Sequence, residues 1–178
     1  MWKQFIVSCR LMIAMTLLTG VIYPFAVTGA SRIVSPSNAK GSLIEREGKI
    51  VGSKLIAQKF TADKYFHSRP SAVDYNALSS GGSNLSPGAK KLKEQREALP
   101  DTPSDLVYAS GSGLDPHISP AAAKFQIDRV AKARGLDVAE VRTLVQKNTE
   151  RRQLAFLGED RVNVLLLNLA LDKVNERR

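Results

Sequence analysis

The sequence lacks the residue patterns that identify many enzymes and metal proteins. One cysteine and two histidines occur among 178 residues, which excludes a disulfide framework and leaves too few ligands for a structural zinc site. Neither the P-loop pattern GxxxxGK(S/T) nor the nucleophile elbow GxSxG is present. Aromatic residues make up 6% of the chain and its basic residues are scattered, so we predict no nucleic-acid partner.

Acidic residues are absent from the first 44 positions, and this region also holds a long uncharged apolar run. Residues 11–30 carry no charge, and about 20 helical residues match the roughly 30 Å hydrocarbon core of a bilayer. Pro24 predicts a kink in this helix, because proline removes a helical hydrogen bond. We therefore predict an N-terminal segment, residues 1–33, that contains a single transmembrane helix over about 11–30.

Two alternatives compete with an uncleaved anchor. A cleaved signal peptide would place Thr28 and Ala30 before a cut at Ser31, but signal-peptide apolar regions run about 7–15 residues. Lipid attachment at Cys9 is excluded, because this cysteine precedes the apolar run instead of following it. Basic residues flank both ends of the run, and long domains translocate largely regardless of charge, so charge counting leaves the orientation open.

The first half of the remaining chain predicts little regular structure. Residues 34–41 are rich in turn-forming residues and predict a linker, after which a soluble domain covers 42–178. At the start of this domain we expect a hairpin over 42–52, a short helix over 53–60 and a long loop over 61–85.

The second half carries clear helix-start signals. Ser86-Pro87 predicts a helix to Leu99, and a buried strand is expected at 105–109. Further helices are expected from Ser119-Pro120 to just before Gly135, from Asp137 onward, and over 161–174, the last one buried in the core. The fold class predicted is α+β, with one N-terminal transmembrane helix and a mixed soluble domain whose C-terminal half is helical.

Serine, aspartate and histidine gather near the glycine-rich turn after residue 109. Ser112, Asp115 and His117 permit the alternative of a membrane-anchored periplasmic hydrolase, although triads are normally assembled from distant segments. His67, His117 and Asp115 could also meet around a metal ion, but no spacing demands it, and we predict no metal site.

A serine- and glycine-rich stretch offers a nucleotide-binding hypothesis. Leu78 followed by Ser79, Ser80, Gly81, Gly82 and Ser83 resembles the LSGGQ motif of ABC ATPases, which contacts a nucleotide phosphate. Glycines allow close backbone approach to phosphate, but such runs are also common in ordinary loops. The alternative is a flexible or partner-contacting loop.

Longer stretches match one family, in order, along essentially the whole chain. They are GVIYPFAVTG (20–29), GSKLIAQKF (52–60), YFHSRPSAVDY (65–75), SGGSNL (80–85), DLVYASGSGLDPHISPAAAKFQIDRVA (105–131) and RVNVLLLNLAL (161–171). With these residues the chain resembles the KdpC family, the C subunits of the bacterial Kdp potassium-transporting P-type ATPases.

The resemblance implies an accessory, non-catalytic subunit of a high-affinity potassium uptake pump in the bacterial inner membrane. It implies three partners: a channel-like potassium-binding subunit, the P-type ATPase subunit and a small membrane peptide. The chain itself has neither the DKTGT phosphorylation sequence of P-type ATPases nor a TVGYG-like filter loop. The resemblance also implies that the chain stabilises the complex and acts as a catalytic chaperone that raises the ATP affinity of the ATPase subunit. No stably bound cofactor is expected, and ATP would be met only through the complex.

One conflict arises within this resemblance. It implies a periplasmic soluble domain, where Ser79–Ser83 could not reach cytoplasmic ATP, so we expect the direct nucleotide contact to be absent there. The alternative is a nucleotide-binding regulator that faces the cytoplasm. For a periplasmic domain we expect a surface that docks on the channel-like subunit, made by the loops around Tyr65–Tyr75 and Ser110–Ile118. The residues that we expect to dock are Tyr65, Phe66, Arg69, Asp115 and His117.

Overall fold

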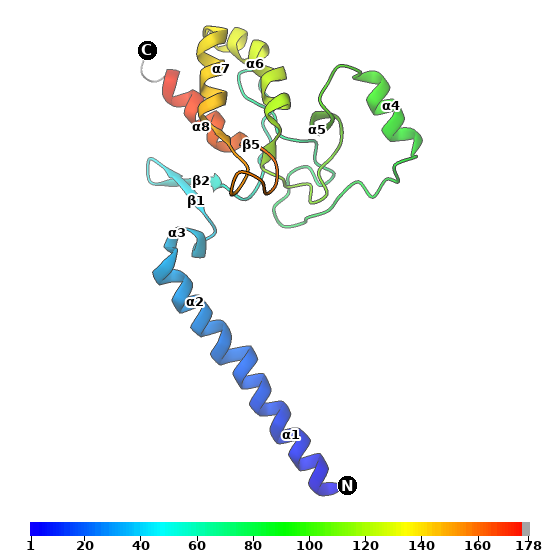
Figure 1. The fold of residues 1–178 in the computed structure, drawn as a ribbon, viewed down its shortest axis with the longest axis vertical. Helices are drawn as coiled ribbons and strands as arrows, with labels where there is room; N and C mark the ends of the chain where they lie inside the picture. Colours follow the sequence, from blue (N-terminus) through cyan, green and yellow to red (C-terminus); the bar gives the residue numbers. More distant parts are fainter. Residues whose placement is uncertain (176–178) are drawn as a thin grey trace. The chain divides into compact units, whose positions relative to one another are not determined.

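The computed structural model describes residues 1–175 and divides the chain into two compact units, Met1–Leu43 and Ile44–Arg178. The first unit is mainly one helix, Trp2–Val34, drawn as a continuous rod in Figure 1. Its 33 residues include a window of mean hydropathy 2.1, and among the described residues it is the one helix long and apolar enough to cross a membrane. The helix is longer at both ends than the 11–30 run predicted.

An irregularity in this helix lies just before its proline. Segment α1 (Trp2–Leu17) passes into a π-helical turn, η1 (Leu18–Ile22), and then into α2 (Tyr23–Val34). Pro24 has no backbone N–H to donate, and π-helical bonds are one way in which a helix accommodates the freed carbonyl. The Thr19 hydroxyl also donates to the Met15 carbonyl at 2.7 Å. A short helix, α3 (Pro36–Ala39), follows where only a turn-rich linker was expected.

The second unit is an α+β domain, as predicted. A hairpin begins it, formed by β1 (Leu43–Arg46) and β2 (Lys49–Ser53). A second, antiparallel sheet has the strand order β3-β5-β4. Its strands are β3 (His117–Ile118), β5 (Arg161–Asn163) and β4 (Thr149–Glu150).

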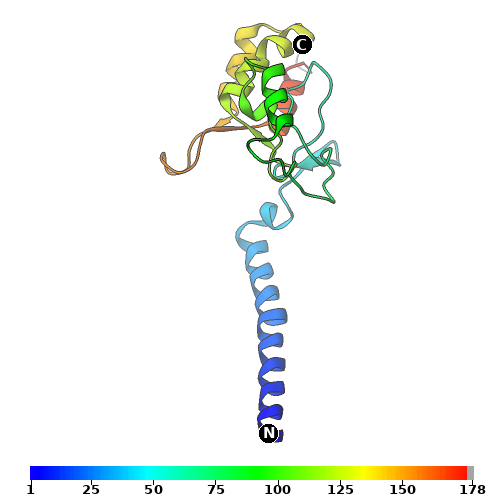
Figure 2. The same ribbon diagram turned by 90° about the vertical axis from the view of Figure 1, so that its right-hand side faces the viewer.

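Three helices supply most of the buried core of this domain. They are α6 (Pro120–Arg134), α7 (Val138–Lys147) and α8 (Val164–Asn175), which gather at one end of the domain in Figures 1 and 2. The starts predicted for α6 and α7 are confirmed, because Ser119 accepts a hydrogen bond from Ala122 N at 3.0 Å and Asp137 accepts one from Ala139 N at 3.2 Å. The predicted end of α6 is also confirmed, since Gly135 takes a left-handed φ of 64°.

Two of the predicted elements are wrong in type. Residues 53–60 form one turn, in which the Ser53 hydroxyl accepts from Leu55 N, and no helix follows. Residues 105–109 are not a strand, because Ser104–Val107 form the short helix α5. Pro103 and Ser104 favour a helical start there, and this local preference outweighs the apolar run.

Two other helices begin later than predicted. Residues 86–89 form a separate turn, in which Ala89 N donates to Ser86 O at 2.9 Å, and α4 (Lys90–Ala98) starts at Lys90. The expected helix over 161–174 begins with β5, the central strand of its sheet, and becomes helical at Val164. The predicted burial of that helix is confirmed, since Leu167 and Leu171 are fully buried.

The long loop between β2 and α4 is held to the helices by buried side-chain amides. Asn168 of α8 accepts from Phe66 N at 2.9 Å and donates to Phe66 O at 3.0 Å. Gln126 of α6 accepts from His67 N at 2.8 Å and donates to His67 O at 3.2 Å. Each amide therefore satisfies both backbone groups of one residue, as a neighbouring β-strand would. A buried backbone group left unpaired would cost about 1–3 kcal/mol, so these two amides stabilise the position of the loop.

Two arginines of α6 bind the loop residues just before Phe66 and His67. Arg134 Nε donates to Lys64 O at 2.6 Å, and its Nη2 bonds Asp172 Oδ1 of α8 at 2.8 Å. The same guanidinium lies 4.9 Å from the centre of the Tyr65 ring, a cation–π distance. Arg129 Nη1 donates to Asp63 O at 2.6 Å. The loop therefore has a defined path from residue 63 to residue 67 although it forms no strand.

Candidate functional site

Three of the predicted docking residues meet in space. Arg69 follows the loop residues that Asn168 and Gln126 bind, and Asp115 lies in the turn before β3. His117 is the first residue of β3. Arg69 Nη1 lies 3.4 Å from Asp115 Oδ2, and His117 Nδ1 lies 3.5 Å from Asp115 Oδ1. The same Oδ1 accepts the backbone N–H of His117 at 3.0 Å. One carboxylate thus joins the two segments that the sequence suggested as a docking surface.

The environment of Asp115 favours its ionised form. Burial by itself would raise the pKa of the carboxyl, but the hydrogen bonds from His117 and the charge of Arg69 outweigh it and lower the pKa below its ordinary value. The side chains of Arg69, Asp115 and His117 keep 29%, 32% and 25% of their surface exposed, so the cluster remains accessible from solvent. A partner could therefore meet these charges without the domain unfolding.

A polar hollow of about 420 Å³ opens beside this cluster. Asp105 reaches its wall and accepts the backbone N–H of Ser119 at 2.6 Å, at the start of α6. Glu159 and Asp160, just before β5, and Arg161, its first residue, also line the hollow. The hollow thus connects the Arg69–Asp115–His117 cluster to the chain between β4 and β5.

The two glycine-rich stretches pack against one another. Gly81 N donates to Ser112 O at 2.8 Å. A Cβ at Gly82 would lie 2.9 Å from Gly111 O, and one at Gly113, whose φ is 69°, would lie 2.7 Å from Gly81 O. Glycine is required at these positions because the two backbones touch, so their lack of side chains already has a packing explanation. The N–H of Gly81 is used within the chain and is not free for a phosphate.

The other members of the predicted nucleotide loop lie at the surface. Ser79, Ser80 and Ser83 are exposed. These hydroxyls could reach a ligand or a partner, and a nucleotide contact by the five residues stays a prediction.

The other two predicted docking residues, Tyr65 and Phe66, have side chains that pack inward. Phe66 is fully buried in the core, so its side chain cannot form part of an exposed docking surface. Tyr65 is half-buried between Phe60, 5.3 Å away between ring centres, and Arg134. Both aromatics position the loop that carries Arg69.

Sequence reasoning missed Tyr75 as a positioning residue. Its hydroxyl donates to Arg69 O at 2.8 Å, while Ser71 Oγ accepts the backbone N–H of Tyr75 at 2.9 Å. Burial, followed by the nearby charge of Asp74, raises the pKa of the Tyr75 phenol, which keeps it protonated as a donor. The aromatic at the end of the YFHSRPSAVDY stretch was the available signal.

The geometry gives no support to the hydrolase alternative. The Ser112 hydroxyl accepts the backbone N–H of Leu114 at 3.1 Å, and within residues 1–175 no hydrogen bond joins Ser112 to His117. A serine nucleophile needs a base within hydrogen-bond reach. Over the same described residues, no three His, Cys, Asp or Glu side chains lie close enough together to hold a metal ion.

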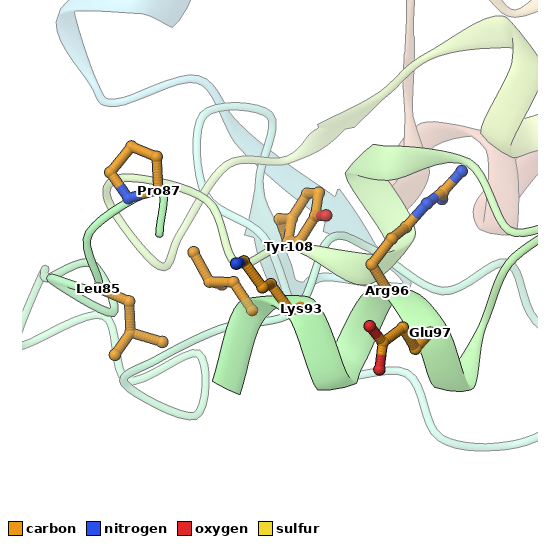
Figure 3. A pocket seen from close by; sticks show the side chains of 7 residues that line it. Leu85, Pro87, Lys93, Arg96, Glu97 and Tyr108 are labelled. Carbon is orange, nitrogen blue, oxygen red and sulfur yellow. The ribbon is translucent and has the colours of Figure 1, made fainter. Parts of the chain in front are cut away.

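A larger hollow of about 550 Å³ lies along α4, away from the charged cluster. Figure 3 shows Tyr108 above the helix, between the side chains of Lys93 and Arg96 in this view. Leu85 and Pro87 complete an apolar wall. None of Ser79–Ser83 lines this hollow, so it does not extend the predicted nucleotide loop.

Comparison with known proteins gives a consistent result over nearly the whole chain. The family model KdpC, described as the K+-transporting ATPase c chain, matches residues 5–173. A potassium-transporting ATPase KdpC subunit of Rhodospirillum rubrum is 55% identical over 174 residues, which cover 90% of each chain. The proteins of the same name from Gemmatimonas aurantiaca and Rhodopseudomonas palustris are 51% and 49% identical, over 91% and 93% of this chain and 88% and 94% of their own.

Replacing Asp115 with asparagine should lower the free energy of unfolding of the full chain in detergent by about 1 kcal/mol at pH 7. The lowered pKa means that the folded state favours the carboxylate. This stabilisation is complete above the pKa of an unfolded carboxyl, about 3.9, and is lost as the pH falls through the lower folded pKa. Urea unfolding at pH 7 and at steps below about pH 4 should therefore show the difference between the two chains shrinking.

The matched control is Asp128→Asn, which removes an exposed carboxylate from α6. If Asp115→Asn costs no more than this control at pH 7, or if its cost does not change with pH, the ion pair does not hold the two segments together.

Proposed function

The chain belongs to the KdpC family of K+-transporting ATPase subunits, and on this premise we propose that it is a non-catalytic accessory subunit that stabilises the pump and raises the ATP affinity of its ATPase subunit. The observation that carries the proposal is that Arg69, which follows the loop held by the buried amides, meets Asp115 and His117 at the start of β3. This arrangement offers an ordered, charged surface for a protein partner.

A non-catalytic role agrees with the chemistry of the described residues. The Asp115 carboxylate is already bonded to the Arg69 guanidinium and to the backbone N–H of His117. The Ser112 hydroxyl accepts the backbone N–H of Leu114 within a turn. Hydrolysis and ion conduction would then belong to the partners: a P-type ATPase subunit, a channel-like potassium-binding subunit and a small membrane peptide. No stably bound cofactor is proposed for this chain.

Placement of the soluble domain decides how ATP affinity could change. We place the chain as a single-pass protein of the bacterial inner membrane, with residues 1–33 as anchor segment, 34–41 as linker and 42–178 as a periplasmic domain. From there, any effect on ATP is indirect. By linkage, the chain must bind the ATP-competent state of its partners more tightly than the other state, and a tenfold rise in affinity needs about 1.4 kcal/mol of such preference.

Direct nucleotide contact is the second candidate, and it requires a cytoplasmic domain. The exposed hydroxyls of Ser79, Ser80 and Ser83 favour it. The use of Gly81 N by Ser112 O weighs against it, because a phosphate-binding loop presents free backbone N–H groups.

A topology reporter fused after Arg178 separates these two candidates. We expect a reporter that works only in the periplasm to be active in this fusion, and one that works only in the cytoplasm to be inactive. The opposite pattern would contradict the periplasmic placement and return Ser79–Ser83 to consideration as a direct contact.

Adding the purified chain to a pump preparation that lacks it should lower the KM for ATP, with little change in kcat. A subunit that favours the ATP-bound state acts on binding more than on the chemical step, which gives this KM-against-kcat split. The chain with Asp115→Lys should lose most of the effect, because two cationic residues would then face each other at Arg69. ATP hydrolysis measured over a range of ATP concentrations checks both expectations.

The control for this experiment is Asp128→Lys, an equal charge change at an exposed position of α6. It should behave like the unmodified chain. An unchanged KM on addition of the unmodified chain, with a pump that is equally stable without it, would contradict the proposed function.

A further inference from the structure

The chain between β4 and β5 forms a hairpin, residues 151–160, that stands away from the helices of its own unit in Figure 2. All ten of its residues are exposed. Gln153 and Leu157 pair across it, with two backbone N–H to O bonds of 2.9 Å. The hairpin therefore has a defined shape although the rest of the domain does not cover it.

The tip of this hairpin is apolar. Leu154 is 77% exposed, Phe156 is 70% exposed and Leu157 is 48% exposed. These side chains are neighbours on one short turn, whereas single exposed apolar residues elsewhere on the surface need no explanation. Clustered apolar side chains on a projecting element are typical of a contact with another molecule.

The backbone of the tip is poorly suited to its own residues. Leu154 and Ala155 take positive φ values of 52° and 69°. Turns with consecutive residues in this region normally carry asparagine and glycine, which adopt it with less strain. The sequence thus keeps a large apolar side chain where a more relaxed turn was available, as expected where a contact has been selected at the expense of stability.

The charges at the base of the hairpin indicate what kind of molecule it meets. Arg151 and Arg152 on one side balance Glu159 and Asp160 on the other. Arg152 N donates to Asp160 Oδ1 at 3.1 Å, and Arg161 Nε donates to Glu150 Oε2 at 2.9 Å. Segments that bind anionic lipid surfaces carry a basic excess, which this hairpin does not have. An apolar tip with a mixed polar rim is typical of a protein–protein contact.

The base of the hairpin shares a hollow with the charged cluster of Arg69, Asp115 and His117. Glu159, Asp160 and Arg161 line the same hollow as Arg69 and Asp115. We propose that the hairpin 151–160 docks on the channel-like potassium-binding subunit, which the neighbouring cluster is expected to meet, by inserting Leu154 and Phe156 into an apolar recess of that subunit. This inference rests on the proposed function, because it names the element that makes the contact, and it assigns the apolar part of the contact to the hairpin and the charged part to the cluster.

Replacing both tip residues, Leu154→Ser with Phe156→Ser, should reduce the amount of partner subunits that co-purify with the tagged full chain by at least about tenfold. Co-purification is measured from mild detergent extracts of cells that produce all subunits. The control is Leu55→Ser, which removes a 62% exposed leucine outside the hairpin and should leave co-purification unchanged. Equal co-purification of the double variant and this control would overturn the inference.

A second variant separates docking from folding. Leu154→Asn with Ala155→Gly gives the turn the residues that its φ angles favour, so the thermal unfolding midpoint of the free chain should stay the same or rise. Co-purification should nevertheless fall, because the apolar tip is reduced. Full co-purification of this variant would count against the insertion of Leu154.

A photo-crosslinking amino acid at position 156 identifies the neighbour. A crosslink to the channel-like potassium-binding subunit, identified by mass spectrometry, is the expected result. A crosslink to a different subunit, to lipid or to a second copy of this chain would overturn the inference in favour of that contact. If the hairpin variants assemble normally while Asp115→Lys does not, the hairpin inference fails and the proposed function stands. If the pump is equally stable and has the same KM without the chain, the proposed function itself fails.

Discussion

The structure of the soluble domain depends on two side-chain amides that pair with the backbone of a loop. Asn168 and Gln126 satisfy both backbone groups of Phe66 and of His67. Without a strand beside it, the loop would otherwise bury N–H and C=O groups that have no partner, which folded proteins avoid. Asn163 plays a related part, since its Nδ2 donates to Lys54 O while its Oδ1 accepts Leu166 N at the start of α8. The helices therefore order the loop through polar contacts within an apolar core.

The ordered loop also fixes the position of the proposed docking surface, because the two are adjacent in the chain. Phe66 is fixed in the core, and Arg69 follows only three residues later. Tyr75 then holds the carbonyl of Arg69, and Arg69 meets Asp115 from a segment 46 positions further along the chain. Preorganised charges of this kind lose little conformational freedom on binding, which favours affinity. The apolar hairpin beside them adds the contact area that a charged cluster alone does not provide.

Features that arise from local sequence could be predicted, and those that arise from distant contacts could not. The apolar run of the first unit, the caps of α6 and α7 and the end of α6 at Gly135 were predicted because each depends on neighbouring residues. The strand expected at 105–109 failed because an apolar run fits a strand or a helical turn, and Pro103 decided between them. The contacts of the polar residues Asn163 and Asn168 could not be predicted, since their partners lie 109 and 102 positions away.

The candidate site shows the same division. The segments that carry Arg69, Asp115 and His117 were identified through family resemblance, and the ion pair that joins them came from the structure. Glycines 81 and 82 suggested phosphate binding, because sequence alone cannot distinguish close approach to a ligand from close approach to another loop. The hairpin 151–160 lacked any motif, and its exposed apolar tip became visible only once the fold showed what was left uncovered.

The most direct test of this account is hydrogen exchange of the Phe66 and His67 backbone N–H groups in the full-length chain. Both are hydrogen-bonded to side chains of the core helices, so they should exchange as slowly as the amides of α6 and α8. Exchange as fast as that of Ser80, which lies exposed in the same loop, would show that the amides do not hold the loop and would contradict the account.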